Sequence, residues 1–228
     1  MTFPLPVLYE DNHLIAINKR AGQLVQGDET GDTPLSELVK GYIREKFKKP
    51  GEAFLGVIHR LDRPVSGVVL FARTSKGLER MNEQFRLKQT QKTYWAIVAQ
   101  APAKPEDRLV HWLEKNEAKN KTTAYRKERD GAQRSELSYR YIKKTPHGHW
   151  LEVKPVTGRP HQIRVQLADI GCPIVGDLKY GAVSANEDAS ICLHARALEF
   201  IHPVTKVPVV ITADLPSVAV WSAVGDPS

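Results

Sequence analysis

The chain has 228 residues, a net charge of +7 at pH 7 and a pI of about 9.4. Hydrophobic residues make up 41% of the sequence and charged residues 26%, which is typical of a globular protein in water. No run approaches the roughly 18 apolar residues of a membrane-spanning helix, and residues 1–6 are too short for the apolar part of a signal peptide. We therefore expect a cytoplasmic protein with a single domain over residues 1–228, in which two lobes are possible.

The first part of the chain predicts a hairpin and a helix. Two β-like runs joined by an Asp-Asn pair indicate a hairpin over residues 7–17. A helix should follow, capped by Thr33, with Pro34 in its first position and residues 49–51 (Lys-Pro-Gly) as its stop.

The remainder predicts more strands and two further helices. The predicted strands cover residues 54–58, 68–72, 93–99, 137–141, 198–202 and 207–212, and the helices begin near Ser75 and Pro160. Residues 101–105 (Ala-Pro-Ala-Lys-Pro) are the clearest break, where a boundary between lobes is expected. Many short strands without regular β-α alternation predict an α+β fold, with a mixed, largely antiparallel sheet and flanking helices.

Residues 59–67 (HRLDRPVSG) place one carboxylate, Asp62, between two arginines in a segment that Pro64 and Gly67 should bend. An arginine within about 4–6 Å would hold the carboxylate ionised. An ionised carboxylate on a loop between strands suits a nucleophile or a base. The alternative is a surface Asp–Arg pair that contributes ~0–1 kcal/mol.

Five motifs in chain order resemble those of the RluA-type pseudouridine synthases, a family that isomerises uridine in ribosomal and transfer RNA. They are residues 8–19 (LYEDNHLIAINK), 59–62 (HRLD), 92–94 (KTY), 157–165 (TGRPHQIRV) and 176–181 (GDLKYG). The resemblance implies a bent, largely antiparallel sheet with an active-site cleft across it. It also implies a small member without the separate N-terminal RNA-binding domain of larger relatives, because the first catalytic strand begins near residue 7.

The resemblance assigns catalytic roles to three residues. Asp62 matches the family's catalytic aspartate and is the expected nucleophile. Arg164 matches the basic residue that pairs with this aspartate and holds it ionised, and Tyr94 matches a tyrosine that lines the uracil pocket and serves in a late proton transfer. The alternatives are plain core packing for Tyr94 and a side chain that reaches solvent for Arg164.

Four further cations are candidates for RNA binding, namely Arg60, Arg63, Arg159 and Lys19. A base must leave its stack to be modified, which costs a few kcal/mol, and the resemblance gives Arg60 the role of holding this flipped-out state. Lys19 and Arg159 either contact phosphate or are ordinary surface charges. Structural roles are expected for His59, His161 and Asp177.

Basic residues are concentrated in two segments. Residues 115–144 carry ten Lys and Arg against four Asp and Glu, and residues 40–49 carry five cations against Glu45. Such segments fit a polyanion, because Lys and Arg neutralise phosphates, although a solvated surface is the alternative. The expected partner is structured RNA, bound by a monomer.

The sequence offers no motif for a metal or a nucleotide cofactor. It lacks both glycine-rich phosphate-binding patterns, and Cys172 and Cys192 are expected to be reduced, buried thiols. The predicted activity is therefore a cofactor-free isomerase that converts uridine to pseudouridine in rRNA and/or tRNA. Two alternatives are a non-catalytic RNA-binding module on the same fold, and a glycosidase or nucleosidase, which would usually need a second carboxylic acid near Asp62.

Overall fold

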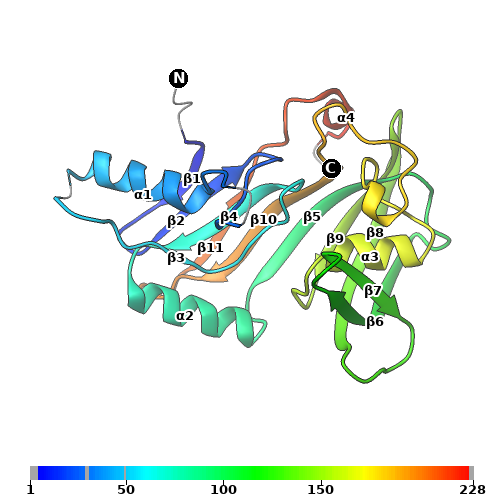
Figure 1. Ribbon diagram of the computed structural model, residues 1–228, viewed down its shortest axis with the longest axis horizontal. Helices are drawn as coiled ribbons and strands as arrows, with labels where there is room; N and C mark the ends of the chain where they lie inside the picture. Colours follow the sequence, from blue (N-terminus) through cyan, green and yellow to red (C-terminus); the bar gives the residue numbers. More distant parts are fainter. Residues whose placement is uncertain (1–4, 29–30, 49, 226–228) are drawn as a thin grey trace. The chain divides into compact units, whose positions relative to one another are not determined.

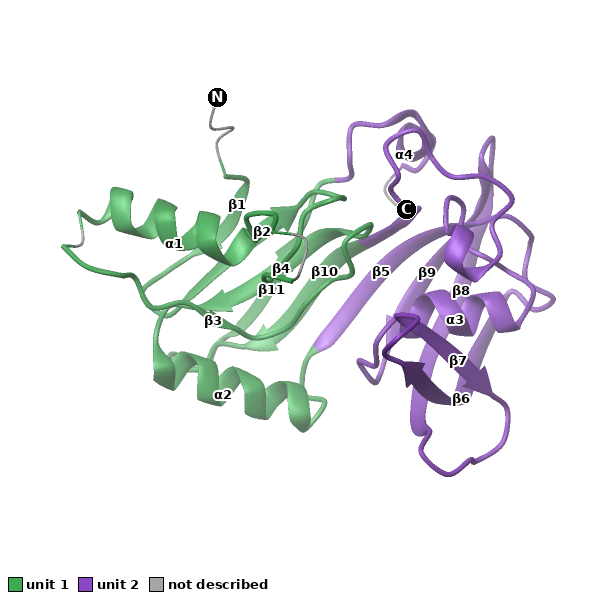
Figure 2. Ribbon diagram, viewed as in Figure 1, with its two compact units in different colours: residues 1–90, 195–214 green, residues 91–194, 215–228 purple. Residues whose placement is uncertain are grey.

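The computed structural model describes residues 5–28, 31–48 and 50–225 (Figure 1). Contacts divide the chain into two compact units, which Figure 2 shows in different colours. Unit 1 comprises residues 1–90 and 195–214, and unit 2 comprises residues 91–194 and 215–228. The boundary expected at residues 101–105 is wrong, because these residues lie inside unit 2 between two of its strands. Two predictions fall partly on residues outside the described ranges. They concern Lys49, at the predicted helix stop, and residues 1–4, in the segment judged too short for a signal peptide.

Unit 1 consists of antiparallel strands and two helices. The strands are β1 (Val7–Glu10), β2 (Leu14–Lys19), β3 (Gly56–Val57), β4 (Ser66–Ala72), β10 (Leu193–Ile201, of which the first two residues belong to unit 2) and β11 (Pro208–Thr212). The helices are α1 (Leu35–Lys46) and α2 (Ser75–Arg86). β2 pairs with β1 on one side and β4 on the other, β3 pairs with β4, and β11 pairs with β10. Alternate residues of β2 and β4 pack with Met81 of α2 and Phe200 of β10 in one apolar core.

The two helices of unit 1 begin differently. Thr74 caps α2 as its side chain accepts a hydrogen bond from the Gly77 N–H, so the predicted start at Ser75 is confirmed. The predicted Thr33 cap of α1 is wrong. Pro34 is itself the N-cap residue and remains extended (φ −74°, ψ 157°), with no capping side chain, so the helix begins one residue later than predicted.

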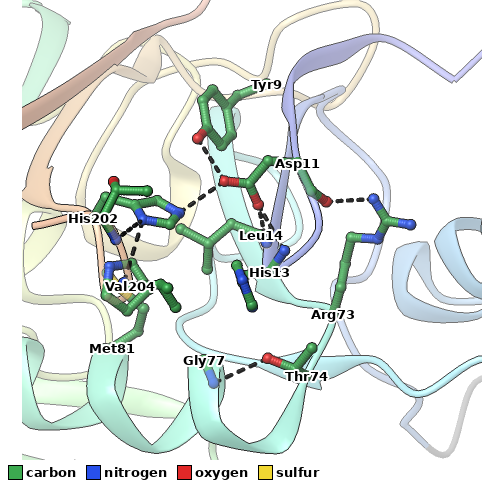
Figure 3. Close-up of polar contacts among 12 residues, drawn as sticks. Tyr9, Asp11, His13, Leu14, Arg73, Thr74, Gly77, Met81, His202 and Val204 are labelled. Atoms are coloured by element: carbon green, nitrogen blue, oxygen red, sulfur yellow. Dashed lines mark hydrogen bonds and ion pairs between the residues drawn. The ribbon is translucent and has the colours of Figure 1, made fainter. Parts of the chain in front are cut away.

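The predicted hairpin at the start of the chain is confirmed, and a partly buried polar network holds it (Figure 3). The Asp11 carboxylate accepts hydrogen bonds from the Tyr9 hydroxyl, from His202 Nε2 and from the backbone N–H groups of His13 and Leu14, each at 2.7 Å. Burial acts to raise the pKa of Asp11, but these hydrogen bonds outweigh it and hold the pKa below its ordinary value. The network therefore joins the β1–β2 turn to the β10–β11 turn, which lies almost two hundred residues later in the chain.

Unit 2 is an antiparallel array covered by a helix. Its strands are β5 (Gln91–Val98), β6 (Glu106–Asn116), β7 (Lys121–Tyr125), β8 (Gln133–Thr145) and β9 (Gly148–Pro155), in the spatial order β5-β9-β8-β6-β7. They are followed by α3 (Gln162–Asp169), a 3₁₀ turn (Leu178–Tyr180) and α4 (Ala219–Ser222). α3 packs on β6 and β7. It begins two residues after the predicted Pro160, because His161 adopts a left-handed conformation (φ 55°) that no helix can continue.

The antiparallel pairings of both units confirm the predicted α+β fold. Cys172 and Cys192 are free and buried, and burial raises the pKa of Cys192 to about 11, so both are inert thiols. Among the residues described, no cluster of His, Cys, Asp and Glu has the composition of a metal site. No helix in the described ranges is both long and apolar enough to cross a membrane.

Candidate active site

Asp62 lies on a tight turn directly before β4. The Val65 N–H donates to the Asp62 carbonyl over 3.0 Å, which closes a four-residue turn through Arg63 and Pro64. Gly67 follows with φ 116°, and a Cβ atom at this position would lie 2.3 Å from the Ala195 carbonyl oxygen of β10. The predicted bend is therefore produced by the turn at Pro64, whereas Gly67 allows β4 to approach β10 closely.

The turn is held from behind by Lys19, the last residue of β2. Its side chain is fully buried, and Nζ donates to three backbone carbonyls, those of Arg20 (3.0 Å), Arg63 (3.1 Å) and Val65 (2.7 Å). Two of these carbonyls belong to the residues that follow Asp62. The expectation that Lys19 contacts RNA phosphate is wrong, because a buried ammonium with three protein acceptors presents no donor to a ligand.

Burial also changes the titration of Lys19. It lowers the pKa of the ammonium from 10.5 to about 7, with the Arg63 charge acting in the same direction and the Asp62 carboxylate acting against it. Three carbonyl acceptors match the three donors of the protonated form. Within unit 1, the charge of this lysine interacts with the Asp62 carboxylate.

The two arginines beside Asp62 are exposed, and their hydrogen bonds go elsewhere. Arg63 donates to the Gly22 carbonyl (3.1 Å) and to Asp32 (2.6 Å), and Arg60 donates to Gln26 Oε1 (3.4 Å). These contacts do not support the alternative of a surface Asp62–Arg pair. Both guanidinium groups are turned toward the loop between β2 and α1, at the surface of unit 1.

His59 has the structural role that the sequence predicts. Its Nε2 accepts a hydrogen bond from the Leu70 N–H of β4 at 3.0 Å, and its ring stacks on Phe85 of α2 with 5.2 Å between ring centroids. An imidazole nitrogen that accepts from a backbone N–H is occupied and does not shuttle protons. His59 therefore fixes the start of the Asp62 segment against β4 and α2.

In unit 2, Arg164 projects from α3 and is buried. Its Nε and one terminal nitrogen donate to the two carboxylate oxygens of Asp177, at 2.7 and 2.8 Å, and its guanidinium lies 5.1 Å from the centre of the Tyr180 ring. The alternative of a solvated Arg164 is excluded, because the side chain is only 6% exposed. The structural role expected for Asp177 is confirmed, but the sequence did not identify Arg164 as its partner. Asp62 and Arg164 belong to different units, and their pairing stays a prediction.

Tyr180 supports the start of α3. Its hydroxyl accepts from the Thr122 N–H of β7 (2.8 Å) and lies 2.7 Å from His161 Nδ1, and burial raises the pKa of this tyrosine. His161, in its left-handed conformation, is thereby tied to the 3₁₀ turn. The structural role expected for His161 is confirmed.

The loop before α3 carries Arg159. Gln162 Oε1 accepts from the Thr157 hydroxyl (2.7 Å) and from the Arg159 N–H (3.0 Å), and Gln162 Nε2 donates to the Glu136 carbonyl (2.9 Å). The backbone of this loop is therefore fixed, while the Arg159 side chain is exposed. This is the arrangement that a phosphate contact requires.

Tyr94 lies near the start of β5 and is partly buried. Lys92, two residues earlier, projects on the same face of the strand, and its Nζ lies 3.6 Å from the place a Cβ atom of Gly158 would occupy. Burial lowers the pKa of Lys92. The Lys-x-Tyr motif thus brings a partly desolvated cation to the loop that carries Arg159, and no role was predicted for this cation.

Comparison with known proteins identifies the family. Residues 13–169 match the RNA pseudouridylate synthase family. The chain belongs to this family. It is 33% identical over 224 residues to the ribosomal large subunit pseudouridine synthase C of Vibrio vulnificus, covering 92% of this chain and 65% of that protein. It is also 33% identical over 234 residues to the tRNA pseudouridine synthase C of Haemophilus influenzae, covering 92% of this chain and 93% of that protein.

A solved structure shows the same fold. Human RNA pseudouridylate synthase domain containing 4 superimposes with a TM-score of 0.76 at 25% identity, covering 92% of this chain and 88% of that chain. The resemblance drawn from the five motifs is confirmed at the level of family and fold. The chain spans about two thirds of the length of several of its curated relatives.

Proposed function

We propose that the protein is an RNA pseudouridine synthase that converts specific uridines of rRNA and/or tRNA to pseudouridine, with Asp62 as nucleophile. The observation that carries the proposal is the Asp62 turn, whose backbone is held by the buried Lys19 ammonium. The support acts through backbone carbonyls, so it fixes the position of the turn that carries the Asp62 carboxylate. Family membership and the names of the relatives agree with this activity.

The reaction breaks the N1–C1′ bond of uridine, rotates the uracil, joins C5 to C1′ and removes the C5 proton. It requires an ionised group at the sugar or base, groups that orient the uracil and a proton acceptor. In the proposed mechanism Asp62 supplies the first, and Tyr94 contacts the uracil and takes part in the final proton transfer. Arg164, fixed by Asp177, supplies the counter-charge that keeps Asp62 ionised.

RNA binding is assigned to exposed cations. Arg60, Arg63 and Arg159 are exposed, and two of them flank Asp62 in the chain. We assign Arg60 to the flipped-out state of the target nucleotide, and Arg63 and Arg159 to phosphates. The two relatives above are named for ribosomal and transfer RNA, which supports these substrates for this chain. We further propose a cytoplasmic monomer, which light scattering of the purified protein tests directly.

Total RNA is taken from a strain that lacks the protein. It is then treated with the purified enzyme, and pseudouridines are mapped by sequencing. Wild type should create pseudouridine at defined positions. Asp62→Asn, which keeps the shape and removes the charge, should create none while RNA retention on a filter persists. Asp130→Asn, an exposed position in the β7–β8 connection, is the matched control and should act as wild type.

Three other outcomes separate the alternatives. Retention of RNA without any nucleoside change would support a binding module. Release of free uracil would indicate a glycosidase. Near-normal turnover by Asp62→Asn would overturn the proposed mechanism.

A further inference from the structure

Unit 1 contains a pocket of about 590 Å³ beside the Asp62 turn, within the range typical of small-molecule sites. Residues from three segments line it, namely the loop before α1, the first turns of α1 and the segment around β3 that leads to Asp62. Those that bear on its chemistry are Gln26, Glu37, Lys40, Leu55, Val57 and Arg60. The proposed mechanism does not use this pocket, although Arg60 belongs to both.

The pocket offers surfaces suited to a flat ring. Leu55 and Val57 contribute apolar side chains, and Arg60 contributes a planar guanidinium. Gln26 Oε1 accepts from an Arg60 terminal nitrogen at 3.4 Å, which orients the guanidinium at the pocket. Unstacked RNA bases are commonly held against aromatic rings or arginine planes, and then recognised along their Watson–Crick edges.

A carboxylate and an ammonium group lie next to each other in the pocket. Lys40 Nζ lies 2.8 Å from Glu37 Oε1, and both side chains are partly exposed, at 34% and 52%. A carboxylate, which only accepts hydrogen bonds, is therefore adjacent to an ammonium, which only donates them. A base that donates two hydrogen bonds to the carboxylate and accepts one from the ammonium must present two neighbouring N–H donors and, beside them, an acceptor.

Guanine alone among the four RNA bases has this edge, with donors at N1 and N2 and an acceptor at O6. Uracil has one N–H between two carbonyl groups, and adenine and cytosine each place a ring-nitrogen acceptor beside their amino group. We infer that the pocket binds a guanine base of the RNA substrate close to the target uridine, with Glu37 on N1 and N2, Lys40 on O6 and the ring against Arg60. This inference rests on the proposed function, and it makes the pocket a specificity-determining site for the sequence around the modified uridine.

The test uses a synthetic RNA stem–loop that contains a uridine mapped as the wild-type target. Each guanosine of the loop is replaced in turn by inosine, which lacks the N2 amino group. At one position, replacement should lower the wild-type kcat/KM about tenfold, the size expected for a bidentate base contact. Glu37→Gln, in which one oxygen becomes a donor, should convert both RNAs at the same rate.

Glu45→Gln is the matched control, because it removes the same charge from the exposed end of α1, away from the pocket. It should keep the full preference for guanosine. Glu37→Ala should behave as Glu37→Gln, and circular dichroism should show that each variant is folded. A mapped loop without guanosine, or an unchanged preference in Glu37→Gln, would overturn the inference. Failure of wild type to convert the parent stem–loop would instead refute the proposed function.

Discussion

The two units stabilise their functional side chains in opposite ways. In unit 1 a buried cation, Lys19, binds the backbone carbonyls of the Asp62 turn. In unit 2 a buried anion, Asp177, binds the guanidinium of Arg164 itself. Support through the backbone fixes the position of the turn that carries Asp62, whereas support through the side chain fixes the orientation of Arg164. The first kind of support suits the proposed role of Asp62 as nucleophile, and the second suits the proposed role of Arg164 as counter-charge.

The largest effect on stability should come from the unit 2 pair. Arg164→Met leaves the Asp177 carboxylate buried without its cation, and Asp177→Asn leaves the Arg164 guanidinium without its anion. Breaking a buried pair on one side typically costs about 3–5 kcal/mol, and both variants should also lose most of their turnover. Urea unfolding and single-turnover rates measure the two effects.

The double variant, Arg164→Met with Asp177→Asn, sharpens this prediction. Neither charge is then stranded, so it should be less destabilised than the sum of the single variants, while its turnover stays low. Additive losses of stability would mean that the two groups act independently and that the comparison between the units is unfounded.

Lys19→Met should have the next largest effect. It leaves the buried Val65 carbonyl without a donor, at about 1–3 kcal/mol for an unsatisfied group, whereas the Arg63 carbonyl still accepts from the Gly22 N–H (2.8 Å), so we expect a loss of about 1–3 kcal/mol. Lys76→Met, an exposed position of α2 in the same unit, is the control and should be near neutral. Turnover should fall in Lys19→Met even at temperatures where it is fully folded, because the backbone under Asp62 is no longer fixed.

The pH dependence of stability tests the same residue. The pKa of Lys19 is about 7 in the folded protein and 10.5 ordinarily. Between these values the unfolded chain holds a proton that the folded chain has released, so this group makes the free energy of unfolding rise with pH. Wild type should therefore gain stability relative to Lys19→Met from pH 7 to pH 9 in urea titrations. Parallel curves for the two proteins would show that Lys19 does not titrate in this range.

A smaller effect is expected at Asp11, which holds the hairpin of unit 1 at a distance from the proposed chemistry. Asp11→Asn keeps one acceptor oxygen but loses the charge, so the cost should be about 1–2 kcal/mol. The pKa of Asp11 is below its ordinary value of 3.8, so its contribution is complete above this pH and is lost as pH falls through the lower folded value. As pH falls below about 4, the free energy of unfolding should therefore decrease more steeply in wild type than in Asp11→Asn. Asp214→Asn, at an exposed position, is the control and should behave as wild type.

The parts of the fold that local chemistry determines were predictable from sequence. The Asp-Asn turn, the start of α2 at Ser75 and the bend at Pro64 each depend on a few adjacent residues. The prediction of a Thr33 cap was wrong because Pro34 can occupy either the N-cap or the first helical position, and only its ψ angle decides between them.

The supports of the site depend on residues far apart in the chain. Lys19 follows Ile15 and Ile17 on one face of β2, and this alternation was the signal that it is buried, but two of its three acceptors lie more than forty residues away. The Arg164–Asp177 pair spans thirteen residues with a turn between them, and neither motif alone identifies its partner. Composition likewise cannot show where the basic residues of one segment lie in space.

The basic segment at 115–144 provides the last and smallest effect. Lys119 lies between β6 and β7, near the strand end where β8 begins, whereas Lys144 lies at the opposite end of β8. Eleven strand residues separate the two ends, or roughly 36 Å. The segment therefore forms two patches, and one RNA strand need not contact both.

Lys119→Gln with Lys127→Gln removes charge from the first patch, and Lys143→Gln with Lys144→Gln removes it from the second. We expect the pair on the RNA path to reduce the slope of log K against log[salt] by about 0.7–0.9 for each phosphate that is no longer neutralised, and the other pair to leave the slope unchanged. The modified uridine should remain the same in both, since phosphate contacts position the protein and carry no sequence information directly. Filter binding between 50 and 200 mM salt measures the slopes. Over this range about six phosphate contacts already change affinity a thousandfold. Equal slopes for both pairs and wild type would place the RNA path on neither patch and would leave the exposed Arg63 and Arg159 as the principal phosphate contacts.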